Sequence, residues 1–447
     1  MASIRSTGVR PALAPAAAAI AAGLLVFLFL LDVVLASIAV LAAFAVVAYL
    51  RRAWWLAACA GVWVLAFVAV LVMPGPYDSW AGRAAIPVLA AYALCFLGGW
   101  ALGRTWWARR AQQSAQQRVR PELSWPSERR LRAYLLVLLV IGIVAALIRY
   151  GFAVPPLLAD NPDAARAAVR GRTNIYEGLL AEAWTLGMAV SLLRVLVGSP
   201  AGRLWYGAFA AVFTFGAALG ASKNSVLVGI APAIIAALSV RPARRATRPV
   251  VSTRIAIVVG LVAVAAAVYL GGQRTLAGTG VFEDEFRARY GDNPAAASVA
   301  SLDLSLSSST ETFGRLWAQR DEMDRRYGAY SLLFLGSRAE PVFGEVDLYG
   351  ITAQLSMPYY MNTATFVAIP LLDFGLAGAA VMLLVLGLAV GVGERRLEFS
   401  QGPAQQVGRA LIVYFAAFGV YELYPAIYPT WLALVPGLWV LYRLGKP

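Results

Sequence analysis

This chain has 447 residues, of which 60% are hydrophobic and only 14% are charged, and its mean hydropathy is +0.68. Such a composition excludes an ordinary water-soluble globular protein, because too much apolar surface would face water. The net charge of +14 would point to nucleic acid in a soluble chain, but most basic residues here fall in short segments between apolar stretches. Membrane orientation accounts for such a pattern, so nucleic acid is not an expected partner.

Apolar runs long enough to cross a bilayer recur along the chain, since a spanning helix needs about 20 residues and must satisfy its own backbone amides. These runs predict about twelve spans. They lie at 12–31, 33–50, 54–73, 84–103, 132–149, 174–197, 203–221, 224–240, 253–271, 364–392, 408–424 and 427–444. No repeat or flexible linker divides them. The sequence therefore predicts an all-α integral membrane protein with a single domain over 1–447.

Basic residues concentrate in alternate connections between these spans, most densely at 104–130 and 241–254. Because positively charged connections stay on the cytoplasmic side, this pattern predicts that both termini are cytoplasmic. The opposite face then carries a short loop at 150–173 and one large extracytoplasmic loop at 272–363. Within the large loop, the charged run from Thr310 to Tyr327 predicts a short amphipathic helix on the membrane surface, capped by Thr310 and ended by Gly328.

Several cations are predicted on the outer face, against the usual orientation bias. They are Arg166, Arg170, Arg172, Lys223, Arg274 and Arg338. Guanidinium groups present paired donors to phosphate oxygens, so a cluster of them at a membrane mouth is suited to a diphosphate or an anionic sugar. The alternative interpretation is a solvated loop face with arginines and a lysine that anchor span ends.

Carboxylates are the candidate general bases, because the chain contains no histidine. Glu345 and Asp347 stand just before the aromatic segment 349–360, which leads back to the membrane. Carboxylates accept hydrogen bonds from sugar hydroxyls and aromatic faces stack on sugar rings, although interfacial aromatic belts have the same composition. Neither a metal site nor a cofactor is predicted.

Two short motifs at the return from the large loop carry a resemblance to a known family. They are Asn362-Thr363-Ala364-Thr365-Phe366 and Asp373-Phe374-Gly375-Leu376-Ala377-Gly378. With the layout of the spans, they resemble the oligosaccharide repeat-unit polymerases, the Wzy-type O-antigen polymerases, over about the last two-thirds of the chain. This family is similar to enzymes of the glycosyltransferase C-type fold.

The resemblance implies a bacterial enzyme of the cytoplasmic (inner) membrane that transfers a polyprenyl-diphosphate-linked glycan to an incoming lipid-linked repeat unit. It implies that the outer cations hold the diphosphate, and that Asn362, Thr363 and Asp373 orient sugar hydroxyls or brace the loop. For Asp373, a helix N-cap before Gly375 is the alternative. Lys223 departs from the arginine usual at its turn. Membrane lipid and a regulator of chain length are the other partners that the family implies.

Three other functions are weighed against this one. O-antigen ligases have similar hydropathy but depend on a histidine, which this chain lacks. A transferase using a polyprenyl-monophosphate sugar would show an acidic pair in the first outer loop, where only Asp32 stands. A flippase or exporter of lipid-linked glycans would suit many spans, but such carriers tend to show two related halves, and no internal repeat is visible.

Overall fold

In the computed structural model, helices joined by short turns make up the parts of the chain that it describes. These parts are residues 32–72, 80–111, 123–151, 153–159, 165, 168–169, 175–198, 202–220, 223–240, 265, 268–269, 271–273, 275–276, 281–323, 325, 327–331, 348–355, 365–420 and 428–446. Within them no strand occurs. The prediction of an all-α protein is confirmed for these residues.

Most described helices coincide with predicted spans. Their bounds are α2 Val33–Leu50, α3 Trp54–Val72, α4 Trp80–Ala111, α5 Glu128–Tyr150, α7 Ile175–Val197, α8 Arg203–Ala218, α9 Lys223–Ser239, α15 Ala368–Leu397, α16 Pro403–Phe418 and α17 Tyr428–Leu444. Of these, α2, α3, α4, α5, α7 and α15 are long and apolar enough to cross a membrane, six helices in the described residues. These helices are typical of a membrane protein.

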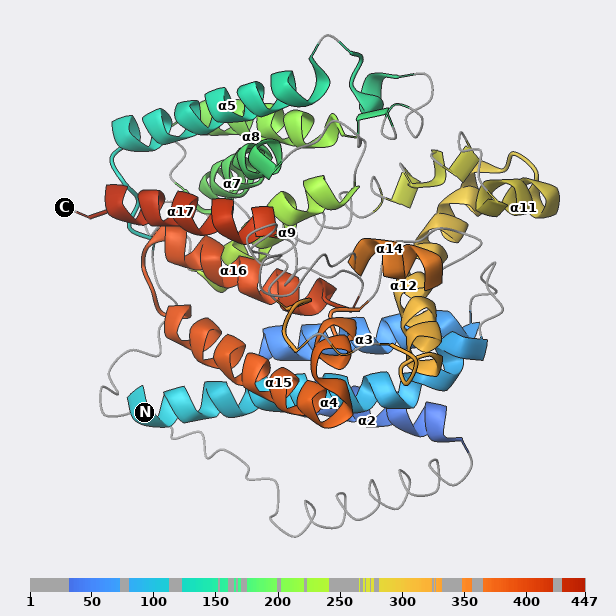
Figure 1. Cartoon of the computed structure of the whole chain (residues 1–447). Coiled ribbons are helices and arrows are strands. Elements are labelled where there is room, and N and C mark those ends of the chain that lie inside the picture. The colour runs from blue at the N-terminus through green and yellow to red at the C-terminus, as the bar shows by residue number, and fades with distance from the viewer. Residues whose placement is uncertain are drawn as a thin grey trace, which may run out of the picture.

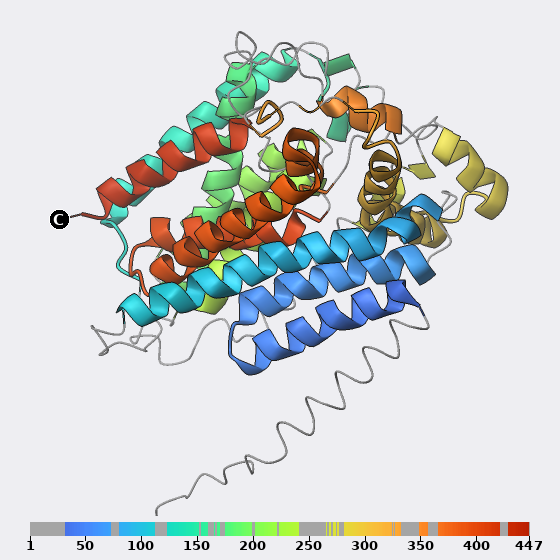
Figure 2. The same ribbon diagram turned by 60° about the horizontal axis from the view of Figure 1, so that its bottom comes forward.

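The helices form two packed groups (Figures 1 and 2). One apolar core joins α2, α3, α4 and α15, and the other joins α5, α7, α8, α9 and α17. Helix α16 contributes to both, since Val413 lies in the first core while Val407 and Tyr414 lie in the second. The large predicted loop contains three described helices, α11 Val281–Tyr290, α12 Pro294–Ala318 and α14 Leu348–Leu355. Figure 1 shows them together at one end of the molecule.

Helices α4 and α15 pack more closely than the others because both present glycines to the contact. A Cβ on Gly99 would stand 2.2 Å from the Leu384 carbonyl oxygen, and one on Gly387 would stand 2.0 Å from that of Phe96. Gly103 meets Leu388 in the same way, so the two helices run parallel. Small residues of this kind let two helix backbones approach directly.

Helix α12 corrects the prediction for 310–327. The helix begins at Pro294, where the Asn293 side chain accepts hydrogen bonds from the amides of Ala295 and Ala296, and it ends at Ala318. Thr310 is therefore not a cap, and its side chain is fully buried. Gly328 lies beyond the helix, in a turn that needs its positive φ of 107°. The sequence predicts an amphipathic helix on the membrane surface, whereas α12 packs against α3 and α4.

Candidate functional site

Most of the predicted site residues lie outside the described residues. This holds for Arg166, Arg170, Arg172, Arg274, Arg338, Glu345, Asp347, Asn362 and Thr363. Lys223 is the first residue of α9, but its side chain is not described. Asp373 is therefore the predicted site residue whose side-chain environment can be analysed.

Asp373 is a fully buried carboxylate that holds the turn 327–331. Its Oδ1 accepts a hydrogen bond from the Tyr330 amide at 3.0 Å, and its Oδ2 accepts from the Ser331 amide at 2.7 Å and the Ser331 hydroxyl at 2.5 Å. Its carbonyl oxygen also accepts from the Tyr327 amide at 3.1 Å. Such charge-assisted bonds replace the water that a buried carboxylate loses. Asp373 thus braces the turn 327–331, and it lies inside α15, whose N-cap is Val367.

Gly375 breaks α15 two residues after Asp373. Its φ of 67° and ψ of −165° lie in a region that residues with a Cβ avoid. A Cβ there would also stand 3.0 Å from the Arg325 guanidinium carbon, so Arg325 covers the kink. The kink therefore explains why glycine follows Asp373 and Phe374 in the second motif.

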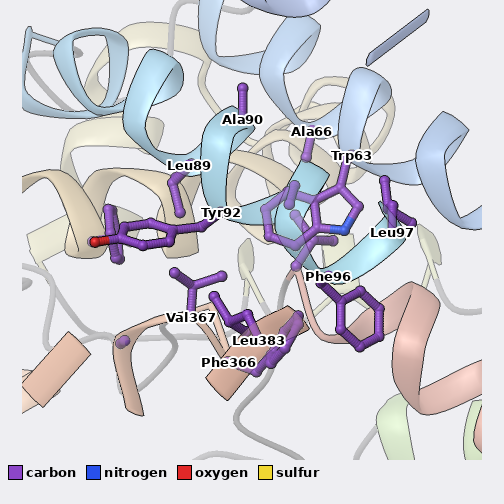
Figure 3. Packing of buried hydrophobic residues seen from close by; sticks show 14 of the residues in the cluster. Trp63, Ala66, Leu89, Ala90, Tyr92, Phe96, Leu97, Phe366, Val367 and Leu383 are labelled. Atoms are coloured by element: carbon purple, nitrogen blue, oxygen red, sulfur yellow. The ribbon is translucent and has the colours of Figure 1, made fainter. Parts of the chain in front are cut away.

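The first motif ends in the apolar core. Phe366 lies between Trp63 of α3 and Phe96 of α4, with ring centroids 6.3 and 5.1 Å away (Figure 3). Its amide donates to the carbonyl oxygen of Gly419 at 2.8 Å. Phe366 thus fixes the point where the chain enters α15, and both motifs anchor the same helix.

A cavity of about 380 Å³ lies beside the braced turn. Helix α12, the turn and helix α14 contribute its walls. The lining residues are Arg315, Gln319, Met323, Tyr330, Ile351, Gln354 and Leu355. Because Asp373 fixes the backbone of Tyr330, the second motif supports one wall of this cavity. A concave site with a few convergent polar groups among apolar ones is typical of small-ligand binding.

Arg315 is the charged residue in this lining, and its contacts tie three helices together. Its Nε donates to Glu311 Oε1 at 3.3 Å, and its Nη1 donates to the Leu355 carbonyl oxygen at the end of α14 at 3.2 Å. Glu311 is buried and also accepts from the Gly82 amide of α4 at 2.7 Å. A cation at a helix C-terminus is favourable, so Arg315 fixes α14 over the cavity.

The middle of α12 carries a buried polar stretch that the sequence analysis did not identify as a site. Its members are Asp303, Ser307, Ser308, Ser309, Thr310, Glu311 and Thr312. Asp303 lies outside the six candidate spans, and burial raises the pKa of its carboxyl group from 3.8 to about 6. Its Oδ1 has no hydrogen-bond partner among the described residues. The sequence feature that could have identified this stretch is its run of consecutive serines and threonines, because these residues have a low preference for helix interiors.

A second polar cluster lies at the other end of α4. It joins α4, α15 and α16 through three arginines and two glutamates, Arg104, Arg395, Arg409, Glu394 and Glu398. Glu394 is fully buried and pairs with Arg104 and with Arg409, whose Nε donates to it at 2.9 Å. Each carboxylate faces at least two guanidinium groups. We call these five residues the ion-pair cluster.

The ion-pair cluster and the cavity are separated by most of the length of α4. Gly82 and Arg104 are separated along α4 by about 33 Å at about 1.5 Å of rise per residue, close to the roughly 30 Å of a bilayer core. The ion-pair cluster and the cavity thus stand at opposite ends of one long apolar helix.

Comparison with protein-family models, curated proteins and solved structures yields no match.

Proposed function

We propose that this protein is a polymerase that joins polyprenyl-diphosphate-linked oligosaccharide repeat units into a surface polysaccharide. In this proposal it lies in the bacterial cytoplasmic membrane, with about twelve spans, both termini inside, and a glycosyltransferase C-like arrangement. The segment 272–363 faces outward, where the lipid-linked glycan would meet the enzyme.

One observation carries the proposal. Asp373, one of the residues on which the family resemblance depends, fixes one wall of a cavity at the end of α4 opposite Arg104, Arg109 and Arg110. A motif that served packing alone would not need a buried carboxylate, since burying one costs free energy unless it is fully hydrogen-bonded. The cavity is where reacting sugars would be held.

The proposed reaction needs neither metal nor cofactor. An acceptor hydroxyl oxygen attacks the anomeric carbon of the donor glycan, and the bond from that carbon to the diphosphate oxygen breaks. Glu345 or Asp347 takes the hydroxyl proton, and the polyprenyl diphosphate leaves as an anion.

The charge that develops on the leaving diphosphate would be stabilised by the predicted outer cations, Arg166, Arg170, Arg172, Lys223, Arg274 and Arg338. Both carboxylates immediately precede α14, whose Gln354 and Leu355 line the cavity. Asn362 and Thr363 would contact sugar hydroxyls.

The environment of Asp32 argues against a transferase that uses polyprenyl-monophosphate sugars. Its Oδ1 accepts from the Val34 and Leu35 amides at 2.8 and 3.3 Å, which caps α2. Its Oδ2 lies 3.2 Å from Arg83. The aspartate of the first outer loop is thus engaged in structure, and no acidic pair accompanies it in the sequence.

Gel analysis of surface polysaccharide from a gene-deletion strain tests the proposal. We expect single repeat units in place of the ladder of long chains, and restoration of the ladder by the wild-type gene. An unchanged ladder would reject the polymerase. Accumulation of lipid-linked units on the cytoplasmic side, with none outside, would instead identify a transporter.

A further inference from the structure

The cavity between α12, α14 and the 327–331 turn differs in charge from what a diphosphate requires. Among the described residues of its lining, Arg315 is the charged one, and Glu311 lies 3.3 Å from it. The side chain of Glu311 is only 4% exposed, so its charge is held against Arg315. A diphosphate carries more than one negative charge and is normally held by several cations. The charge available here is already balanced.

The two nearby arginines that the structure describes, Arg320 and Arg325, do not change this balance. Arg320 donates to the Trp317 carbonyl oxygen, lies over the Trp317 ring at 4.4 Å, and pairs with Asp321 at 3.2 Å. Arg325 covers the Gly375 kink. Neither of them lines the cavity.

The remaining lining combines hydrogen-bonding amides with apolar and aromatic surface. Gln319 and Gln354 each offer one acceptor and two donors, and Arg315 is a donor fixed by its contacts with Glu311 and Leu355. Met323, Tyr330 and Ile351 supply the apolar faces. A sugar ring has the complementary pattern, with hydroxyls around its edge and C–H groups on its faces. The volume of about 380 Å³ lies within the range of small-ligand pockets.

We infer that this cavity binds an uncharged sugar ring of the glycan and leaves the diphosphate to cations elsewhere. The inference rests on the proposed function, since it assigns one part of that substrate to one site. Gln354 and Gln319 would hydrogen-bond the ring hydroxyls, and Arg315 would serve as a positioned donor whose charge Glu311 neutralises.

Saturation-transfer NMR on the full-length protein in nanodiscs tests this assignment. The probe is the strain's own surface polysaccharide, cut to oligosaccharides by mild acid so that no lipid or diphosphate is attached. We expect transfer to ring protons that neither added salt nor an equal concentration of inorganic pyrophosphate reduces. Gln354→Ala and Gln319→Ala should each weaken oligosaccharide binding about threefold to tenfold, the effect of one hydrogen bond.

Gln401→Ala is the matched control, because Gln401 is an exposed glutamine in the link between α15 and α16, at the opposite end of the molecule. It should bind like the wild type. Displacement by pyrophosphate, absence of transfer to the oligosaccharide, or unchanged binding by both glutamine variants would overturn the inference. A deletion strain that loses its ladder, combined with any of these outcomes, would leave the polymerase standing and reject only the sugar site.

Discussion

The two polar regions at the ends of α4 both contain buried charged side chains, but they differ in how many ion pairs they form. In the ion-pair cluster, Glu394 and Glu398 are surrounded by three arginines that pair with them. Around the cavity, a single pair of Glu311 and Arg315 holds the frame, and uncharged amides line the space. In the cluster, oppositely charged side chains pair with one another and hold the helices together. In the cavity, polar side chains face an open space where a ligand can bind.

The comparison also separates carboxylates by their partners. Glu394, Glu311 and Asp373 are each buried and hydrogen-bonded or paired, while Asp303 keeps one oxygen without a partner in the described residues. We therefore expect a substitution to lower the free energy of unfolding more when it removes more hydrogen-bond or ion-pair partners.

Removing the central charge of the ion-pair cluster should have the largest effect. Glu394→Gln leaves Arg104 and Arg409 without their shared carboxylate, and we expect it to lower the free energy of unfolding by about 3–5 kcal/mol. Thermal unfolding of the purified protein in detergent measures this. The control is Asp321→Asn, which breaks the exposed pair with Arg320 and should change stability by less than about 1 kcal/mol. Equal effects of both substitutions would contradict a structural role for the cluster.

The buried carboxylate of Asp303 in α12 should make stability depend on pH. The pKa of Asp303 is about 6 in the folded protein and 3.8 when unperturbed, so between these values the folded state binds a proton that the unfolded state does not. The contribution of Asp303 to stability should therefore be fully present below pH 3.8 and be lost as the pH rises through 6. The shift corresponds to at most about 3 kcal/mol.

Asp303→Asn isolates this contribution. The variant should be more stable than the wild type at pH 7.5 and should approach it near pH 4, as measured by unfolding at both pH values. Histidine usually dominates titration between pH 5 and 8, and this chain contains none, so the difference should be clear. A gap between the two proteins that is the same at both pH values would show that Asp303 does not titrate there.

Releasing the braced turn should disturb the cavity more than the fold. Asp373→Asn places an amide N–H group toward the Ser331 donors, and we expect a loss of about 1.5–3 kcal/mol together with shorter polysaccharide ladders in complemented deletion strains. The comparison variant is Ser331→Ala, which removes the hydroxyl bond but keeps both amide bonds. It should have the smaller effect on both measurements. Full ladders with Asp373→Asn would separate the motif from function.

Sequence patterns predicted the apolar helices well and the polar interior poorly. The bounds of α2, α3 and α5 follow from runs of apolar residues, since crossing a bilayer imposes length and composition directly. The burial of α12 does not follow from its own residues, because Ser307 to Thr312 are as polar as a solvated surface. Only contacts with α3 and α4 decide its environment. Likewise, Asp373 was singled out from the motif, but its partners Tyr330 and Ser331 are remote in sequence and carry no pattern of their own.

The contact between α4 and α15 connects the two polar regions, so widening it should disturb both. Gly99→Ala would place a Cβ 2.2 Å from the Leu384 carbonyl oxygen, and we expect the forced separation to cost about 1–3 kcal/mol. The adjacent Gly98→Ala has no atom within 4 Å of its new Cβ. It should leave stability unchanged or raise it by about 0.5–1 kcal/mol, because alanine favours helix more than glycine does. The two variants share one chemical change on one helix, and thermal unfolding compares them directly. If Gly98→Ala were the more damaging of the two, the parallel glycine contact would be wrong, and with it the rigid link that places the cavity and the ion-pair cluster at opposite ends of α4.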